Sequence, residues 1–62
     1  MKSFEYVNAM GIRKKLIVYP MKEGKYPISL WIAETGENCG MGTATAEEIK
    51  NFLANYGINA II

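Results

Sequence analysis

The segment 45-TAEEIKNFLANYG-57 decides the fold that this sequence predicts. Thr45, followed three residues later by Glu48, matches a capping box, in which each side chain accepts a hydrogen bond from the other residue's backbone N–H. Gly57 suits the left-handed position that ends a helix, with Ile58 packing back against the last turn. The apolar residues between these signals follow the i, i+3, i+4, i+7 spacing and form one stripe: Ile49, Phe52, Leu53 and Tyr56. We therefore expect an amphipathic helix whose stripe must cover an apolar surface.

That apolar surface is predicted to be a β-sheet built from the upstream residues. The segments 13-RKKLIVY-19 and 28-ISLWIAE-34 alternate like strands, and the charged segment between them, with Gly24 and two prolines, is typical of a hairpin connection. A turn is expected around Gly36. Shorter strand candidates are 3-SFEYVNAM-10, 39-CGMGT-43 and the tail 58-INAII-62. The prediction is a single α+β domain over residues 1–62, in which a three- to four-stranded antiparallel sheet carries the C-terminal helix on one face.

Alternation gives this sheet two apolar faces. The helix stripe is expected to cover one face, formed by Leu16, Val18, Ile28, Leu30 and Ile32. The second face carries Ile17, Tyr19 and Trp31, and we assign Tyr26 and Met41 to it as well. A contiguous exposed patch of apolar and aromatic side chains marks an interaction site.

The small size of the chain favours assembly. A domain of this length buries only about 60% of the surface that its unfolded chain exposes, and such domains commonly gain stability from disulfides, a metal or oligomerisation. The sequence has one Cys and no His, so neither an internal disulfide nor a tetrahedral zinc site can form within one chain. We expect a homodimer without metal or cofactor, and we expect Cys39 to be a small buried or half-buried side chain.

No motif indicates catalysis. Without His there is no Ser–His or Cys–His dyad. Glu47 and Glu48 are adjacent, so their side chains diverge on a helix, and the helix cap accounts for them. The loop 36-GENCGMG-42 lacks the lysine of a phosphate-binding loop, and its glycines indicate tight turning. We expect no catalytic residues and a protein that is not an enzyme.

The charge pattern allows two interpretations. Six of the seven basic residues lie within residues 1–31, and four of the six acidic residues lie within residues 32–62. This asymmetry indicates an anionic partner on one face, or simply two solvated surfaces.

The apolar runs are too short to span a bilayer and the first residues lack a signal-peptide core, so we expect a cytoplasmic protein without a membrane contact.

Two kinds of partner fit the aromatic face. Rings flanked by basic side chains are the elements of a platform for single-stranded nucleic acid, on which bases stack while Lys and Arg contact phosphates. The same rings would suit a dimer interface, or the grip of a small phage- or prophage-type regulator or inhibitor on a host protein. Both alternatives stay open at this stage. The candidate nucleic-acid-binding residues are Arg13, Lys14, Lys15, Tyr19, Lys25, Tyr26 and Trp31.

Three segments also resemble a known family: 25-KYPISLW-31, 40-GMGT-43 and 45-TAEE-48. They are similar to the positive-cofactor (transcriptional-coactivator-like) single-stranded-DNA-binding domain of bacterial and phage type, over roughly residues 25–56. The positions matching at the same spacing are Lys25, Tyr26, Ile28, Trp31, Glu47 and Glu48, and Gly40, Met41 and Gly42 match the glycine segment after shifts. The resemblance implies a dimer built through the helices, with the strands presenting a concave DNA-binding face. Ser29 stands where the family has a basic residue, and Cys39 and Met41 stand where lysines flank its glycines.

Overall fold

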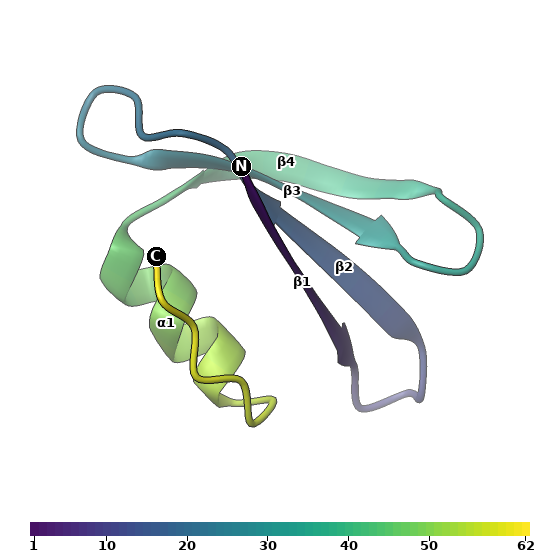
Figure 1. The fold of residues 1–62 in the computed structure, drawn as a ribbon. Helices are drawn as coiled ribbons and strands as arrows, with labels where there is room; N and C mark the ends of the chain where they lie inside the picture. The colour runs from purple at the N-terminus through teal and green to yellow at the C-terminus, as the bar shows by residue number, and fades with distance from the viewer.

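The computed structural model describes residues 1–62 and consists of four strands followed by one helix (Figure 1). The elements are β1 (Lys2–Val7), β2 (Arg13–Val18), β3 (Tyr26–Ile32), β4 (Asn38–Ala44) and α1 (Ala46–Ala54). The strands form one antiparallel sheet in the order β1-β2-β3-β4, so each strand pairs with its neighbour in the chain. This confirms the predicted α+β class. The tail after α1 forms no strand.

The strand register separates two faces. On the side of α1, Leu16 lies opposite Leu30, and both line a cleft with side chains of the helix. On the other side, Lys15 lies opposite Trp31. We call this second side the open face, because no helix lies over it (Figure 1). Its side chains are Ser3, Glu5, Val7, Arg13, Lys15, Ile17, Tyr19, Pro27, Ser29, Trp31, Met41 and Thr43.

Both ends of α1 confirm the signals in the sequence. The Thr45 side chain accepts the Glu48 backbone N–H at 3.2 Å, and the Glu48 carboxylate accepts the Thr45 N–H at 2.8 Å. At the other end, Gly57 has a φ of 75°. The Ile58 N–H then reaches the Leu53 carbonyl at 3.1 Å, which is the long bond of a Schellman ending. The helix has nine residues, and no helix of the chain has the length and apolar character needed to cross a membrane.

The core lies between α1 and the first two strands. Ile49 and Leu53 of the helix are buried with Leu16 and Val18 of β2. Tyr6 of β1 is buried with them. Burial raises the pKa of Tyr6, and the nearby Tyr56 raises it further. An aromatic cluster ties β1 to the helix, with ring centroids 5.4 Å apart for Tyr6–Phe52 and 4.2 Å apart for Tyr6–Tyr56.

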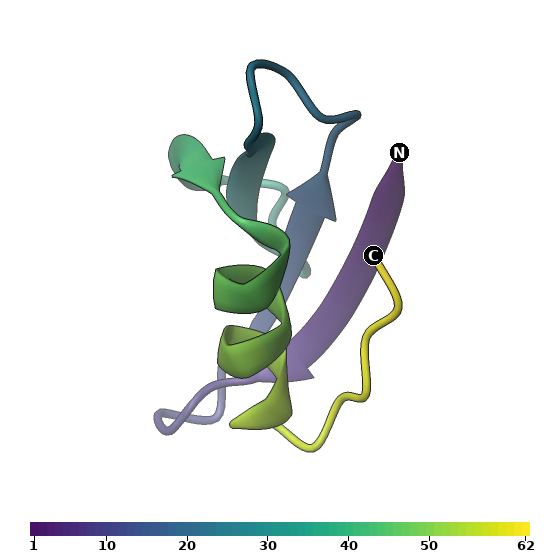
Figure 2. The same cartoon turned by 90° about the vertical axis from the view of Figure 1, so that its left-hand side faces the viewer.

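The C-terminal tail adds to this half of the core. It runs back beside β1 (Figure 2). Ala60 is buried, and the Lys2 ammonium donates to the Ile61 carbonyl. Ile58 and Ile62 pack against the core from the same tail. The helix and the tail together therefore cover β1 and β2, while Ile28 and Leu30 of β3 stay half-buried. The helix packs on one face of the sheet, as predicted, and because it is a cylinder about 10 Å wide it spans about two strands spaced by about 4.8 Å.

The connection between β2 and β3 ends in a tight two-residue turn. Lys22 and Lys25 exchange backbone hydrogen bonds of 2.7 and 3.1 Å. Between them, Glu23 has a φ of 53° and Gly24 a φ of 82°. Two successive positive φ angles define a type I′ hairpin turn, for which Asn-Gly is the preferred sequence. Glu23 is the only residue other than glycine with a positive φ.

Replacing Glu23 with Asn should therefore stabilise the protein. Asn tolerates the left-handed region better than Glu, so we expect Glu23→Asn to raise the free energy of unfolding by up to about 1 kcal/mol. Gly24→Ala is the matched control and should destabilise by about 1 kcal/mol, because alanine is strained at a positive φ. Thermal unfolding followed by circular dichroism measures both. A Glu23→Asn variant that is less stable than the wild type would contradict the turn assignment.

The capping box should make the helix sensitive to acid. Hydrogen bonds from the Thr45 backbone and side chain lower the pKa of Glu48, and the charge of Lys25 contributes. Because the folded state favours the carboxylate, this stabilisation is present above the ordinary pKa of 4.5 and is lost as the pH falls through the lowered pKa.

The expected result is a smaller loss of stability in Glu48→Gln than in the wild type as the pH falls from about 5 to about 2. The glutamine oxygen still accepts the Thr45 N–H but does not titrate. Glu47→Gln removes a carboxylate from the same turn outside the capping box, so it should keep the acid sensitivity of the wild type. Melting temperatures across this pH range provide the measurement. Equal acid sensitivity in Glu48→Gln and the wild type would exclude this role for Glu48.

Candidate functional site

The centre of the open face is Ser29, which is fully buried although it points away from the core. Its hydroxyl oxygen accepts the indole N–H of Trp31 at 2.7 Å. The same hydroxyl is hydrogen-bonded to the Tyr19 hydroxyl at 3.0 Å. One small residue therefore satisfies the polar atoms of both rings, and its complete burial indicates that the rings lie over it.

Contacts within the single chain fix the two aromatic side chains. Trp31 follows Ser29 by two residues, so both point to the same face of β3. Tyr19 extends from the end of β2, where its backbone N–H bonds to the Pro27 carbonyl at 2.9 Å. Both rings are half-buried, so part of each is open to solvent. The geometry provides a rigid apolar surface with the N–H of the indole already satisfied.

The charges beside the rings are mixed. Lys15 lies opposite Trp31 on one side and opposite Glu5 on the other. Arg13, at the start of β2, makes a 3.8 Å ion pair with Glu34, and both side chains are exposed. Exposed pairs of this kind contribute about 0–1 kcal/mol, so an anionic ligand could compete for the arginine.

The seven candidate residues do not share one face. Tyr19, Trp31, Arg13 and Lys15 lie together on the open face, as predicted. The assignment of Tyr26 to this face is wrong, since Tyr26 lies opposite Ala44 and packs against the core on the helix side. The expected position of Met41 is confirmed by its pairing with Ser29.

Two of the predicted basic residues also lie away from the rings. Lys14 pairs with Tyr6 and Ile32 on the helix side, where its ammonium donates to the Cys39 sulfur at 3.3 Å. Lys25 belongs to the hairpin, outside the regular sheet pairing. Its charge helps to lower the pKa of Glu48, although the hydrogen bonds from Thr45 contribute more. Neither residue lies beside Trp31 in the strand register.

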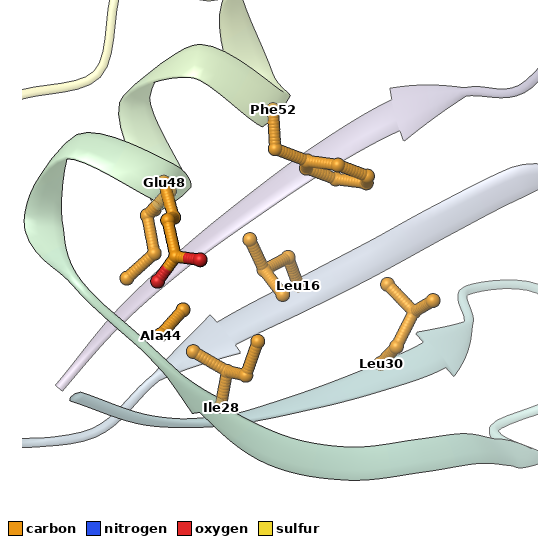
Figure 3. Close-up of a pocket in the computed structure, with 7 residues that line it drawn as sticks. Leu16, Ile28, Leu30, Ala44, Glu48 and Phe52 are labelled. Carbon is orange, nitrogen blue, oxygen red and sulfur yellow. The ribbon is translucent and has the colours of Figure 1, made fainter. Parts of the chain in front are cut away.

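A second surface lies on the helix side, beside the uncovered half of the sheet. This helix-side cleft has a volume of about 270 Å³. Figure 3 shows Glu48 and Phe52 reaching from α1 toward Leu16 and Ile28, with Leu30 farther from the helix. The lining residues are Leu16, Ile28, Leu30, Ala44, Glu48, Ile49 and Phe52. The cleft is almost entirely apolar, and it exists because α1 stops short of β3 and β4.

The edge strand β4 continues this cleft outward. A bulge opposite Leu30 and Trp31 leaves Cys39 as the extra residue, and Gly40 supplies the φ of 150° that follows it. Cys39 is exposed, so the expectation that its side chain is buried or half-buried is wrong. The reason is that β4 is an edge strand that neither the helix nor the C-terminal tail covers. No three His, Cys, Asp or Glu side chains lie together in a group that could hold a metal ion.

The structural roles of three residues were not predicted from the sequence. Phe4 and Tyr6 supply the β1 side of the core, and their i, i+2 spacing was the available signal. For Ser29, the sequence indicated a departure from a basic position but not its burial. The Ser-x-Trp spacing on one strand face could have indicated the hydrogen bond that it makes.

Searches of family models, curated proteins and solved structures found no significant match for this chain.

Substituting Ser29 should loosen the aromatic pair. Ser29→Ala removes the acceptor of the Trp31 N–H and the partner of the Tyr19 hydroxyl. We expect a loss of about 1–2 kcal/mol in the free energy of unfolding, because each hydrogen bond contributes about 0.5–1.5 kcal/mol. Trp31 fluorescence should shift in wavelength and lose anisotropy. Ser3→Ala, on the exposed part of the same face, is the control and should change neither the stability nor the Trp31 fluorescence. An unchanged Trp31 spectrum in Ser29→Ala would contradict the hydrogen-bonded geometry.

Proposed function

We propose that this protein binds single-stranded nucleic acid through its open face, as a homodimer without catalytic activity. The observation that carries the proposal is the Trp31–Ser29–Tyr19 arrangement, which holds two rings on the sheet surface. Bases stack on such rings with about 1–3 kcal/mol per base, regardless of their sequence. Rings that are already fixed lose little rotamer freedom when a base stacks on them.

The phosphate contacts fall to Lys15 and Arg13. These are the basic side chains that the strand register places on the ring side of β2. Lys15 is the nearer candidate, because it lies directly opposite Trp31. For Arg13, a phosphate would replace the exposed carboxylate of Glu34 as the partner. With only two cations beside the rings, stacking supplies most of the affinity and the dependence on salt is modest.

The resemblance to the single-stranded-DNA-binding domain supports the same function from a different direction. Among the positions that match the family, Trp31 lies on the open face, whereas Tyr26 faces the core. The position of the family's basic strand residue holds Ser29, which here orders the rings in place of contacting a phosphate. The proposed setting is the cytoplasm, where an exposed and unpaired thiol such as Cys39 stays reduced.

Titration with an unlabelled deoxythymidine oligonucleotide tests the proposal through the fluorescence of Trp31, the only tryptophan. We expect quenching at low salt. Two phosphate contacts give a slope of about −1.4 for log affinity against log salt, or about a sevenfold loss of affinity from about 50 to about 200 mM salt. No quenching at high micromolar oligonucleotide and low salt would overturn the proposal.

A matched pair of charge variants sharpens the test. Lys15→Gln should halve the salt slope to about −0.7. Lys50→Gln removes the same charge from the exposed side of α1, away from the rings, and should leave the slope unchanged. If the open face instead binds a host protein, the oligonucleotide should not quench Trp31 in the wild type or in either variant.

A further inference from the structure

The β4 strand is a sheet edge that the rest of the chain leaves unprotected. The opposite edge, β1, carries the charges of Lys2 and Glu5, and the C-terminal tail lies beside it. By contrast, β4 contains no charged residue and no proline, and every residue from Asn38 to Thr43 is exposed. Charges, prolines, bulges and covering segments are the usual means of keeping an edge from pairing. Of these, β4 has only the bulge at Cys39, so it is the less protected of the two edges.

The glycines of β4 leave room beside the edge on the helix side. Gly42 lies opposite Ile28 and Gly40 lies opposite Leu30. A Cβ atom added at either glycine would meet nothing within 4 Å. Packing within one chain thus does not require glycine at position 42. Two hollows of about 270 and 240 Å³ share Ile28 and Leu30 as their floor.

We propose that β4 pairs with the β4 strand of a second copy, joining the two sheets edge to edge, so that the helix-side clefts of the two copies lie beside each other. A two-fold interface brings equivalent residues together, so a charged edge would repel itself, whereas this edge has no charge to oppose. The apolar side chain of Met41, 76% exposed in the single chain, gains cover by this pairing.

The small number of buried residues supports a self-association of this kind. Only seven of the 62 residues are buried, and chains of fewer than about 70–80 residues commonly need such a supplement. The proposal rests on the homodimer in the proposed function, but not on nucleic-acid binding. It differs from the helix-mediated dimer that the family resemblance implies.

Matched pairs of lysines on the two edges test the interface. Met41→Lys with Thr43→Lys places like charges on β4, at exposed positions of the open face. Ser3→Lys with Val7→Lys places the same charges on β1, also on the open face. Light scattering should give twice the chain mass of 6.9 kDa for the wild type and for the β1 variant. The β4 variant should remain folded by circular dichroism and should have the mass of a monomer.

Cys39 gives a second measurement that needs no substitution. It is the only cysteine and lies on β4, so a short bis-maleimide should crosslink two wild-type chains efficiently. Crosslinking should persist in the β1 variant and disappear in the β4 variant. A wild type that is monomeric at high micromolar concentration and does not crosslink would overturn the proposal. So would a dimer that survives the β4 lysines.

The two proposals fail separately. A dimer that crosslinks through Cys39 but does not quench with oligonucleotide supports the β4 interface and overturns nucleic-acid binding. A monomer whose Trp31 fluorescence is quenched by oligonucleotide supports nucleic-acid binding and overturns the β4 interface together with the homodimer.

Discussion

The structure depends on the contact between one short helix and the first half of the sheet. Ile49 and Leu53 bury themselves against β2, and the rings of Phe52 and Tyr56 close over Tyr6 of β1. The nine-residue helix packs mainly over two strands. Because the C-terminal tail also returns to β1, the helix side of β3 and β4 is only partly covered, so Ile28 and Leu30 stay half-buried. The helix-side cleft and the exposed edge follow from this single constraint.

The division of the sheet gives its two faces different roles. On the helix side, β1 and β2 provide the core, while β3 and β4 provide an apolar surface that a second copy is proposed to cover. On the open face, Ser29 holds Trp31 and Tyr19 by their polar atoms. Ring positions are thus set by β2 and β3, the two central strands, and do not depend on the edge proposed for assembly.

Much of the fold could be predicted from local signals. The capping box, the apolar stripe and Gly57 located the helix, and alternation located the strands because both patterns act over a few residues. Strict alternation also places Tyr26 with Ile28 and Lys14 with Leu16 on the helix side, so both positions were predictable from the sequence. The burial of Ser29 and the exposure of Cys39 depend on which strands are central and which are edges. That information is not local, so the residue pattern alone did not contain it.

The order of the strands has a consequence for how the chain folds. Every strand pairs with its neighbour in sequence, so the whole sheet closes through short loops at a small entropic cost. The contacts that join distant segments are those of α1 and the tail with β1, such as Lys2 with Ile61. We expect the hairpins to form rapidly and the two chain ends to meet last, since folding slows as contacts become more distant in sequence. Until the ends meet, the apolar side chains of β1 and β2 stay as open to water as those of β3.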